Sequence, residues 1–406
     1  MIWLRRGSIV VPVLAGIWMI VIVVSISIIM SFSTGDPFKP ELMLSFLTGA
    51  ASGSIFIFKK NKNLNRLLII LVVVLLAVVG YGPVNFISDA YHRFFTAAAV
   101  NGFVAALFIF ALSKTFLDIN YGFLSRHAFE NCLIRFLVGF GYIFFAAIVV
   151  IPFYVMVMTS FKNQSKLMLN PLDFSIDFSQ GVALFRSYFE LFSQFNFGTY
   201  LWISFFVSVL TVIITLIFAI PGAYAVGRLR FKGRAAFSRS ILLIYMVPMI
   251  VLVLPIYIGF SVLGLRNSIF GIIFIYPVTT IPVAIYMLQG YFRSLPHEVE
   301  EAGLMDGLSR VSVILKITLP LSLPALASVS LYVFMIAWNE FLLAFMLLDD
   351  PSKFTLTRGI AMLDSSEIPR QHLMAGSVIA TIPIMVLFLG LERFMTKGLA
   401  SGSVKG

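Results

Sequence analysis

Cysteine, histidine and charged side chains are all scarce in this chain. It has one cysteine, Cys132, so it cannot form an internal disulfide, and its 4 histidines offer little material for a structural metal site. Charged residues make up 12% of the 406 residues, against about 25% in an average soluble domain. These shortages disfavour thiol or metal chemistry, and they exclude an ordinary soluble fold.

Apolar residues take the place of the missing charge and make up 60% of the chain. A helix that crosses the roughly 30 Å hydrocarbon core of a bilayer needs about 20 predominantly apolar residues. We therefore expect an all-α, polytopic transmembrane bundle of about ten spans. The segments that meet this requirement lie near 8–32, 42–58, 67–88, 95–113, 137–158, 200–223, 240–262, 268–291, 323–348 and 373–394.

The net charge of +11 indicates membrane orientation and not nucleic-acid binding. The basic residues are spread over alternate loops, whereas a nucleic-acid site would gather them in one patch. With the N-terminus in the cytoplasm, most of the 29 Lys and Arg residues fall in inner loops, as the positive-inside rule requires. We expect a multi-pass protein of the cell membrane with both termini in the cytoplasm and no nucleic-acid partner.

The chain divides into two parts of different character. Residues 1–125 contain four closely spaced spans with no polar motif that indicates a role, so they form an N-terminal extension of unknown function. Residues 126–406 contain six spans and longer polar stretches, among them an inner loop near 292–322 and an outer loop near 349–372. Loops of this length commonly carry function.

The inner loop has the pattern of two short helices joined by a turn. Ser294 is a candidate N-cap with Pro296 in the first turn, and three glutamates follow near the positive end of the helix dipole. Gly307 can take the left-handed conformation that ends a helix, Ser309 can cap the next helix, and Pro320 ends it. A structured loop on the cytoplasmic face predicts a docking surface.

This loop resembles the coupling loop of the inner-membrane permeases of ATP-binding-cassette importers. Their pattern is E-A-A, three residues, G, nine residues, I-x-L-P, and this chain has Glu301-Ala302-Gly303, Gly307 and Ile317-Thr318-Leu319-Pro320 at those spacings. The one departure is Gly303, where a second alanine is usual; glycine costs up to about 1 kcal/mol of helix propensity. Further segments are similar to the carbohydrate-uptake branch, and within it to the MalG-like subunit of maltose-type importers. They are 159–162, 223–233, 255–257, 263–265, 337–341 and 398–406.

The resemblance covers about residues 137–406 and implies that this chain works with other subunits that have different functions. A second homologous permease subunit completes the path as a heterodimer, a dimer of ATPase subunits lies beneath, and an external binding protein delivers the sugar. This chain has no G-x-x-x-x-G-K-[ST] run, so ATP and Mg are expected to bind the partner ATPase. The chain itself is expected to be no enzyme and to hold no cofactor.

The family pattern also implies residue roles. The loop that docks on the ATPase is represented by Glu301, Ala302, Gly303, Asp306, Gly307, Ile317, Leu319 and Pro320. The end of the chain resembles a tail that reaches the ATPases, formed by Ser403, Val404, Lys405 and Gly406. The outer loop from Asp349 to His372 is expected to contact the binding protein, with no role assigned to single residues.

Glu340 is the one acid that these limits place well inside a span, next to Asn339. A carboxylate there costs about 2.5–3.5 kcal/mol on insertion scales, so Glu340 should face the bundle interior or the aqueous path. We favour a packing or gating role for Asn339 and Glu340 over direct contact with a sugar hydroxyl.

Two other classes of protein compete with this interpretation. An ion-coupled secondary transporter would use intramembrane ionisable groups and commonly shows internal repeats; here Glu340 is the only such candidate, and no repeat is evident. A membrane-embedded enzyme would need a nucleophile, a metal cluster or paired carboxylates in the spans. The sequence does not name the sugar, and maltose or maltodextrin is our first expectation, with other oligosaccharides next.

Overall fold

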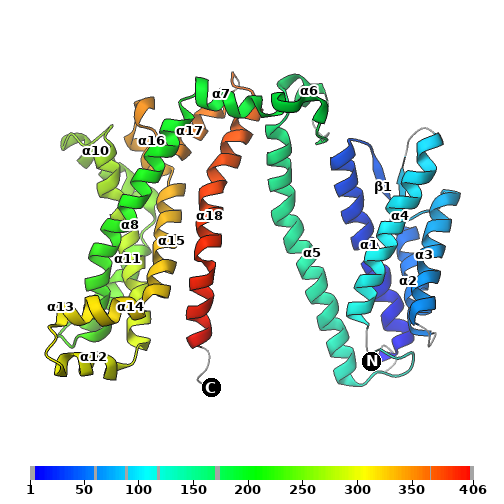
Figure 1. Ribbon diagram of the computed structural model, residues 1–406, viewed down its shortest axis with the longest axis horizontal. Helices are drawn as coiled ribbons and strands as arrows, with labels where there is room; N and C mark the ends of the chain where they lie inside the picture. The colour runs from blue at the N-terminus through cyan, green and yellow to red at the C-terminus, as the bar shows by residue number, and fades with distance from the viewer. Residues whose placement is uncertain are drawn as a thin grey trace. The chain divides into compact units, whose positions relative to one another are not determined.

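The computed structural model describes residues 5–58, 62–86, 90–116, 119–169, 174–365 and 367–402, and almost all of its regular structure is helical (Figure 1). The chain forms two compact units, Met1–Leu184 and Phe185–Gly406. The boundary expected between residues 125 and 126 lies inside the first unit, where it separates α4 from α5. A division of the chain into two functional parts between residues 125 and 126 stays a prediction.

The first unit contains the helices and strands that precede residue 185. They are α1 (Gly7–Thr34), β1 (Phe38–Pro40), α2 (Leu42–Phe58), α3 (Lys62–Val79), β2 (Val84–Phe86), α4 (Ala90–Thr115), α5 (Arg126–Ser160), α6 (Gln164–Leu169) and most of the 3-10 segment η2 (Phe178–Phe185). Helix α2 lies tightly against α1, because a Cβ atom on Gly49 would lie 2.6 Å from the Met19 Cβ and one on Gly53 would lie 2.5 Å from the Ala15 Cβ. This G-x-x-x-G spacing therefore serves close helix packing.

The third predicted span, 67–88, extends too far. Helix α3 ends at Val79, and Gly80 follows with φ +94°, a conformation that favours glycine. Residues 84–86 then form β2, which pairs antiparallel with β1. Gly80, Gly82 and Pro83 follow Val79 in the sequence and are signals that a helix ends; the predicted span passed over them because apolar residues continue on both sides.

The second unit carries the loop that resembles a coupling loop. Its elements are α7 (Arg186–Gln194), α8 (Phe197–Arg228), α9 (Arg234–Tyr245), α10 (Met249–Val262), α11 (Ile269–Ser294), α12 (His297–Met305), α13 (Arg310–Val313), the π-helical η3 (Ile314–Thr318), α14 (Leu319–Leu321), α15 (Leu323–Asn339), α16 (Leu342–Leu347), the 3-10 turn η4 (Pro351–Lys353), α17 (Leu356–Leu363) and α18 (Arg370–Gly402).

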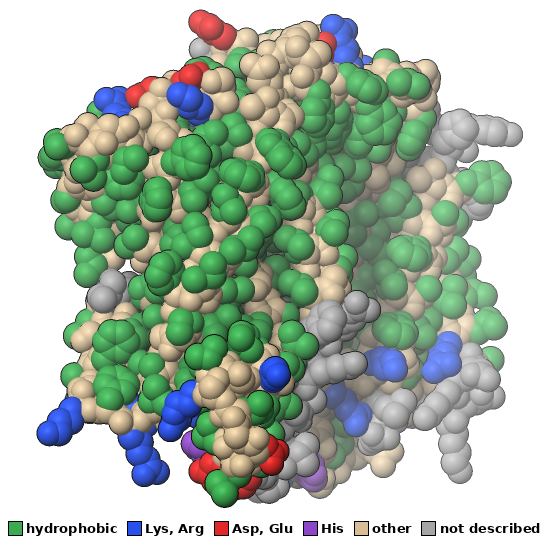
Figure 2. Space-filling model, turned by 60° about the vertical axis from the view of Figure 1, so that its left-hand side comes forward, with side chains coloured by type: hydrophobic (Ala, Val, Ile, Leu, Met, Phe, Trp, Pro, Cys, Tyr) green, Lys and Arg blue, Asp and Glu red, His purple; other side chains and the backbone are tan. Residues whose placement is uncertain are grey.

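The core of the second unit forms where α8 packs against α11 and α15. Large side chains such as Tyr276, Phe292 and Leu288 are fully buried there. Within this unit, α12 to α14 lie at one end and α7, α16 and α17 at the other (Figure 1). Hydrophobic side chains cover the surface between the two ends, and charged side chains gather at the ends (Figure 2), as expected of a membrane-embedded bundle.

A membrane helical fold is thus confirmed. Among the described residues, six helices are long and apolar enough to cross a membrane: α1, residues 95–115 of α4, α5, α8, α11 and residues 370–392 of α18. Helices α2, α3 and α10 are apolar but shorter, and the pair formed by residues 310–321 and 323–339 is bent by 81°. The exact count of ten spans stays a prediction.

Two predicted spans are interrupted. The expected span 240–262 contains α9 and α10, which are separated at Met246–Pro248; Pro248 has an extended backbone and is the N-cap of α10. The expected span 323–348 breaks at Glu340, where ψ is 122°. The placement of Glu340 well inside one continuous span is therefore wrong, because its own side chain replaces the helical hydrogen bonds at the break.

Candidate functional site

The loop between α11 and α15 begins later than the sequence indicated. Helix α11 continues to Ser294, whose hydroxyl donates back to the Tyr291 carbonyl at 2.7 Å, and Pro296 is the N-cap of α12. The assignment of Ser294 as the N-cap is therefore wrong. Glu298 and Glu300 lie in the first turn of α12, where the helix dipole favours negative charge.

The turn that ends α12 is a Schellman motif. Gly307 has φ +85°, its N–H donates to the Leu304 carbonyl at 3.1 Å, and the Leu308 N–H donates to the Gly303 carbonyl at 3.0 Å. This pair of bonds satisfies carbonyls that the helix end leaves free, and it needs a left-handed residue at the position of Gly307. The predicted turn is confirmed and has a fixed geometry.

The second arm of the loop is longer than expected. Ser309 caps α13 as predicted, with its Oγ accepting from the Ser312 N–H at 3.2 Å. Pro320 does not end the helical arm, because the chain continues through the π-helical η3 into α14 and bends only at Ser322. A proline in the first turn of α14 is tolerated, since its missing N–H has no required partner there.

Gly303 is the point where the two arms touch. It is buried, and an added Cβ would lie 2.5 Å from Ile317 Cδ1 and 3.6 Å from Val313 Cγ2. The glycine in place of the usual alanine therefore lets α12 lie closer to η3. The flexible end of Ile317 fills the space that an alanine methyl group would otherwise take.

A buried polar network fixes α12 to the end of α8. Glu300 is 7% exposed; its Oε1 lies 3.4 Å from Arg228 Nε and accepts from the Thr318 hydroxyl at 2.9 Å. Its Oε2 accepts from the Tyr224 hydroxyl at 3.3 Å. Arg228 also donates to the Leu295 carbonyl at 2.8 Å. Four segments, α8, the α11–α12 junction, α12 and η3, therefore meet at one buried ion pair.

The outer surface of α12 remains open. Glu298, Glu301 and Asp306 are exposed, as is Ala302, and Met305 is 88% exposed. Acidic side chains gather at the end of this unit that carries α12 (Figures 1 and 2). An apolar side chain surrounded by acids on a short, anchored helix is suited to contact another protein.

The residues expected to form the coupling loop fall into two groups. Gly303 and Ile317 pack on each other inside the loop, while Glu301, Ala302, Asp306 and Gly307 lie on its exposed side. Leu319 and Pro320 lie in α14, before the bend. Residues Ser403, Val404, Lys405 and Gly406 lie outside the described residues.

Sequence reasoning missed the buried network. Tyr224 and Arg228 lie in the segment 223–233 that supported the resemblance, and Arg228 is a charge at the end of an apolar run. A charge at the end of an apolar run is a sequence signal that could have marked Arg228 as a structurally important cation. No local spacing, however, pairs it with Glu300 or Thr318, because three helices lie between Arg228 and α12 and five between Arg228 and η3.

Glu340 caps α16. Its carboxylate oxygens accept from the Leu343 N–H at 2.7 Å and the Ala344 N–H at 3.1 Å, and the buried Tyr276 hydroxyl donates to it at 2.7 Å. Asn339 is exposed, and its amide donates to the Met335 carbonyl. These contacts use much of the hydrogen-bonding capacity of Glu340, which favours the packing role over sugar binding.

The segment from Asp349 to His372 is folded onto the unit. Leu356 and Leu363 of α17 are buried, and the Leu356 N–H donates to the Ser204 hydroxyl at 2.7 Å. A Cβ on Gly359 would collide with the Tyr200 ring. The exposed residues of the segment include Asp349, Asp364, Glu367 and Arg370.

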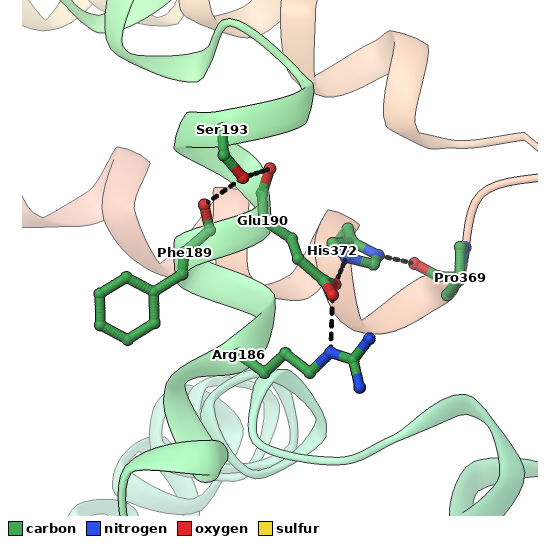
Figure 3. A network of polar contacts seen from close by, with 6 residues as sticks. All are labelled: Arg186, Phe189, Glu190, Ser193, Pro369 and His372. Carbon is green, nitrogen blue, oxygen red and sulfur yellow. Dashed lines mark hydrogen bonds and ion pairs between the residues drawn. The ribbon is translucent and has the colours of Figure 1, made fainter.

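Polar contacts hold both ends of this segment. Asp349 pairs with Arg266 at 2.7 Å. At the other end, Glu190 of α7 bonds to His372 Nε2 at 2.8 Å and to Arg186 Nε at 2.6 Å (Figure 3). The Arg186 guanidinium and then His372 lower the pKa of Glu190 below its ordinary value, because both favour the charged carboxylate.

The fold and this loop define a polytopic helical membrane protein with a rigid, acidic loop at one end of its second unit. Comparison with known proteins identifies the family. Residues 219–400 match the family described as binding-protein-dependent transport system inner membrane component. The chain is 36% identical over 275 residues to the inner membrane ABC transporter permease protein YcjP of Escherichia coli, covering 66% of this chain and 96% of the relative.

Two further comparisons agree. The trehalose/maltose transport system permease protein MalG of Thermococcus litoralis is 34% identical over 281 residues, covering 68% of this chain and 99% of that relative. A crystal structure of a bacterial ABC transporter involved in the import of the acidic polysaccharide alginate has the same fold, with a TM-score of 0.56 and 24% identity; it covers 67% of this chain and 98% of that one. The chain belongs to this family of transport-system permeases and is a transport component, not an enzyme.

Proposed function

We propose that this chain is one of two homologous permease subunits of an importer that moves a sugar into the cell. Relatives that match this chain over nearly their whole length are named as permeases for trehalose/maltose and for arabinooligosaccharides, which supports maltose, maltodextrin or another oligosaccharide as substrate. ATP and Mg bind a separate ATPase dimer, and an external binding protein delivers the sugar. Both termini and α12 face the cytoplasm.

The observation that carries the proposal is the rigid attachment of α12. Its exposed face carries Glu301, Asp306 and Met305, while its buried face is fixed by Glu300 and Gly303. A helix that is anchored on one side and open on the other moves with the bundle when a partner displaces it. Closure of the ATPase dimer thereby shifts the bundle between two states that the partner contacts differently.

The remaining contacts with partner proteins follow from the placement of α12 on the cytoplasmic side. The outer segment 349–372 meets the binding protein through its exposed charged residues, while buried α17 supports them. Residues 403–406 extend from α18, whose C-terminal end lies at the same end of the second unit as α12, and they reach the ATPases.

The test reconstitutes the chain in liposomes with the permease and ATPase that co-purify with it. We expect ATP-dependent uptake, and ATP hydrolysis stimulated by the loaded binding protein, across a panel that includes maltose, trehalose and arabinooligosaccharides. Uptake by this chain alone, driven by a proton or sodium gradient, would instead support a secondary transporter.

Charge reversal locates the ATPase contact. Glu301→Lys combined with Asp306→Lys should abolish co-purification of the ATPase and stimulated hydrolysis, because both exposed carboxylates face the partner. Glu367→Lys is the matched control for co-purification alone, since Glu367 is an exposed acid of the outer segment 349–372 and that segment is proposed to meet the binding protein. Equal loss of ATPase binding in both variants would contradict this assignment.

A further inference from the structure

Asn267, in the turn between α10 and α11, contacts a stretch of chain that lies far from it in the sequence. Its backbone N–H donates to the Leu347 carbonyl at 2.7 Å. Its side-chain Oδ1 accepts from the Asp349 and Asp350 N–H groups at 3.2 and 3.1 Å. Its carbonyl accepts from Lys353 Nζ at 3.1 Å. The N–H, the carbonyl and the side chain of one residue thus all bind the stretch from Leu347 to Lys353.

These contacts require an unusual backbone conformation. Asn267 has φ +53°, in the left-handed region that asparagine enters more readily than most residues with a side chain. Helix α16 ends at Leu347 and the backbone is extended after it, so the N–H groups of Asp349 and Asp350 have no helical carbonyl to bind. The Asn267 side chain supplies the acceptor that they would otherwise lack, which glycine at the same φ could not do.

The neighbouring ion pair adds little to this attachment. Arg266 pairs with Asp349 at 2.7 Å, and its guanidinium lies 4.8 Å from the centre of the Tyr257 ring. The Arg266 and Asp349 side chains are 39% and 55% exposed, so water screens the pair. The hydrogen bonds of Asn267 therefore provide most of the attachment at this end.

The attachment joins the start of the outer segment to α11. Helix α11 begins at Ile269, directly after this turn. Beyond η4, the Leu356 N–H at the start of α17 donates to the Ser204 hydroxyl of α8 at 2.7 Å. Pro351 and Ser352 of η4 lie between these two attachments and are exposed. The exposed turn η4 is therefore held on both sides.

We propose that Asn267 is a positioning residue for the docking of the external binding protein. It holds the start of the outer segment 349–372 in the conformation that the binding protein contacts. This inference rests on the proposed function, in which that segment meets the binding protein. A surface that is ordered before it binds loses less conformational entropy on binding. Asn267 thereby raises the affinity for the binding protein through the segment and not by direct contact.

The test uses Asn267→Gly in the complete complex, reconstituted in lipid nanodiscs with the sugar-loaded binding protein that stimulates the wild type. Glycine keeps the left-handed backbone and removes the side-chain acceptor. We expect the concentration of binding protein that half-maximally stimulates ATP hydrolysis to rise about tenfold, because two hydrogen bonds are lost. The maximal stimulated rate should stay within about twofold of wild type, because only docking is weakened. A role in overall stability would instead lower the maximal rate or the amount of assembled complex.

Two further variants separate the side chain from the backbone. Asn196→Gly is the matched control, because Asn196 is the other described non-glycine residue with positive φ, also +53°, and its side chain makes no capping hydrogen bond. It should leave the half-maximal concentration unchanged. Asn267→Asp should keep most of the affinity, because a carboxylate oxygen accepts the same two N–H bonds and aspartate tolerates the left-handed region. The added charge lies beside Lys353, which donates to the carbonyl of the same residue.

Hydrogen–deuterium exchange gives a readout that does not depend on transport. The amides of residues 348–354 should exchange about tenfold faster in Asn267→Gly than in wild type, and the bound binding protein should slow them again.

The outcomes separate this inference from the proposed function. An unchanged half-maximal concentration in Asn267→Gly would overturn the positioning role and leave the proposed function standing, whether or not exchange becomes faster. An equal rise in Asn196→Gly would also overturn it, because the effect would then belong to the backbone substitution. A wild-type complex whose ATP hydrolysis does not respond to any loaded binding protein would overturn the proposed function, and this inference with it.

Discussion

Replacement of Glu300 by glutamine should loosen α12 without altering its exposed surface. The Glu300 side chain is 10% exposed and that of Arg228 only 2%, so the change leaves a buried cation without its anion. Breaking a buried pair in this way costs about 3–5 kcal/mol. We expect the lower end, about 3 kcal/mol, because the glutamine oxygen still accepts a hydrogen bond from Thr318 or Tyr224.

Hydrogen–deuterium exchange of the α12 amides measures this effect directly, because local opening sets their exchange rates. A loss of about 3 kcal/mol corresponds to exchange more than about 100-fold faster. The same variant should lose sugar-stimulated ATP hydrolysis, because a loosened helix no longer transmits displacement. Glu301→Gln is the control for the exchange measurement alone, since its exposed side chain lies one residue away and contributes no buried pair.

A double variant tests whether the effect is electrostatic. Arg228→Met combined with Glu300→Gln removes the orphaned cation, so protection of α12 should recover partly, since an apolar replacement of a buried pair is often neutral. Two results would refute the reasoning: exchange of α12 within about threefold of wild type in Glu300→Gln, or strictly additive effects of the two substitutions.

Two further predictions concern the loop, and a third concerns the contact of α7 with α18 at the other end of the unit. Gly307→Val should uncouple uptake from ATP hydrolysis in a protein that still inserts, because φ +85° is strained for a β-branched residue. Gly307→Asn should keep most activity, because asparagine tolerates the left-handed region. Normal uptake by both variants would contradict the role of the turn. Gly303→Ala should change the stability of α12 by less than about 1 kcal/mol, because better helix propensity offsets the displacement of Ile317 Cδ1. The exchange rates of the α12 amides measure this stability. A large loss of stability would show that Ile317 cannot move. Glu190 has a pKa below its ordinary value of 4.5, so the stability it gives to the α7–α18 contact is present above pH 4.5 and is lost as pH falls through the lowered value. Exchange of α7 amides in wild type should therefore rise in that acidic range relative to Glu190→Gln, and equal profiles would contradict the assignment.

Local sequence signals correctly predicted those features of the loop between α11 and α15 that depend on local backbone geometry. Gly307 was expected to be left-handed and Ser309 to be an N-cap, and both are, because these roles depend on neighbouring backbone atoms. Ser294 failed as an N-cap because nothing local shows that α11 continues to it. The break at Glu340 was hidden because long apolar runs flank Asn339 and Glu340 on both sides. In the structure the Glu340 carboxylate accepts from the Leu343 and Ala344 N–H groups and so supports the break.

By itself the sequence determined that the chain is a helical membrane protein and that a structured polar loop lies near residues 292–322, because both depend on hydrophobicity and on turn chemistry along the chain. Only the structure decided that this loop begins after Ser294. The tertiary structure decided what holds that loop. Arg228 and Glu300 meet only after α8, α11 and α12 have packed, and a buried charge is stable there only because its partner arrives from another helix.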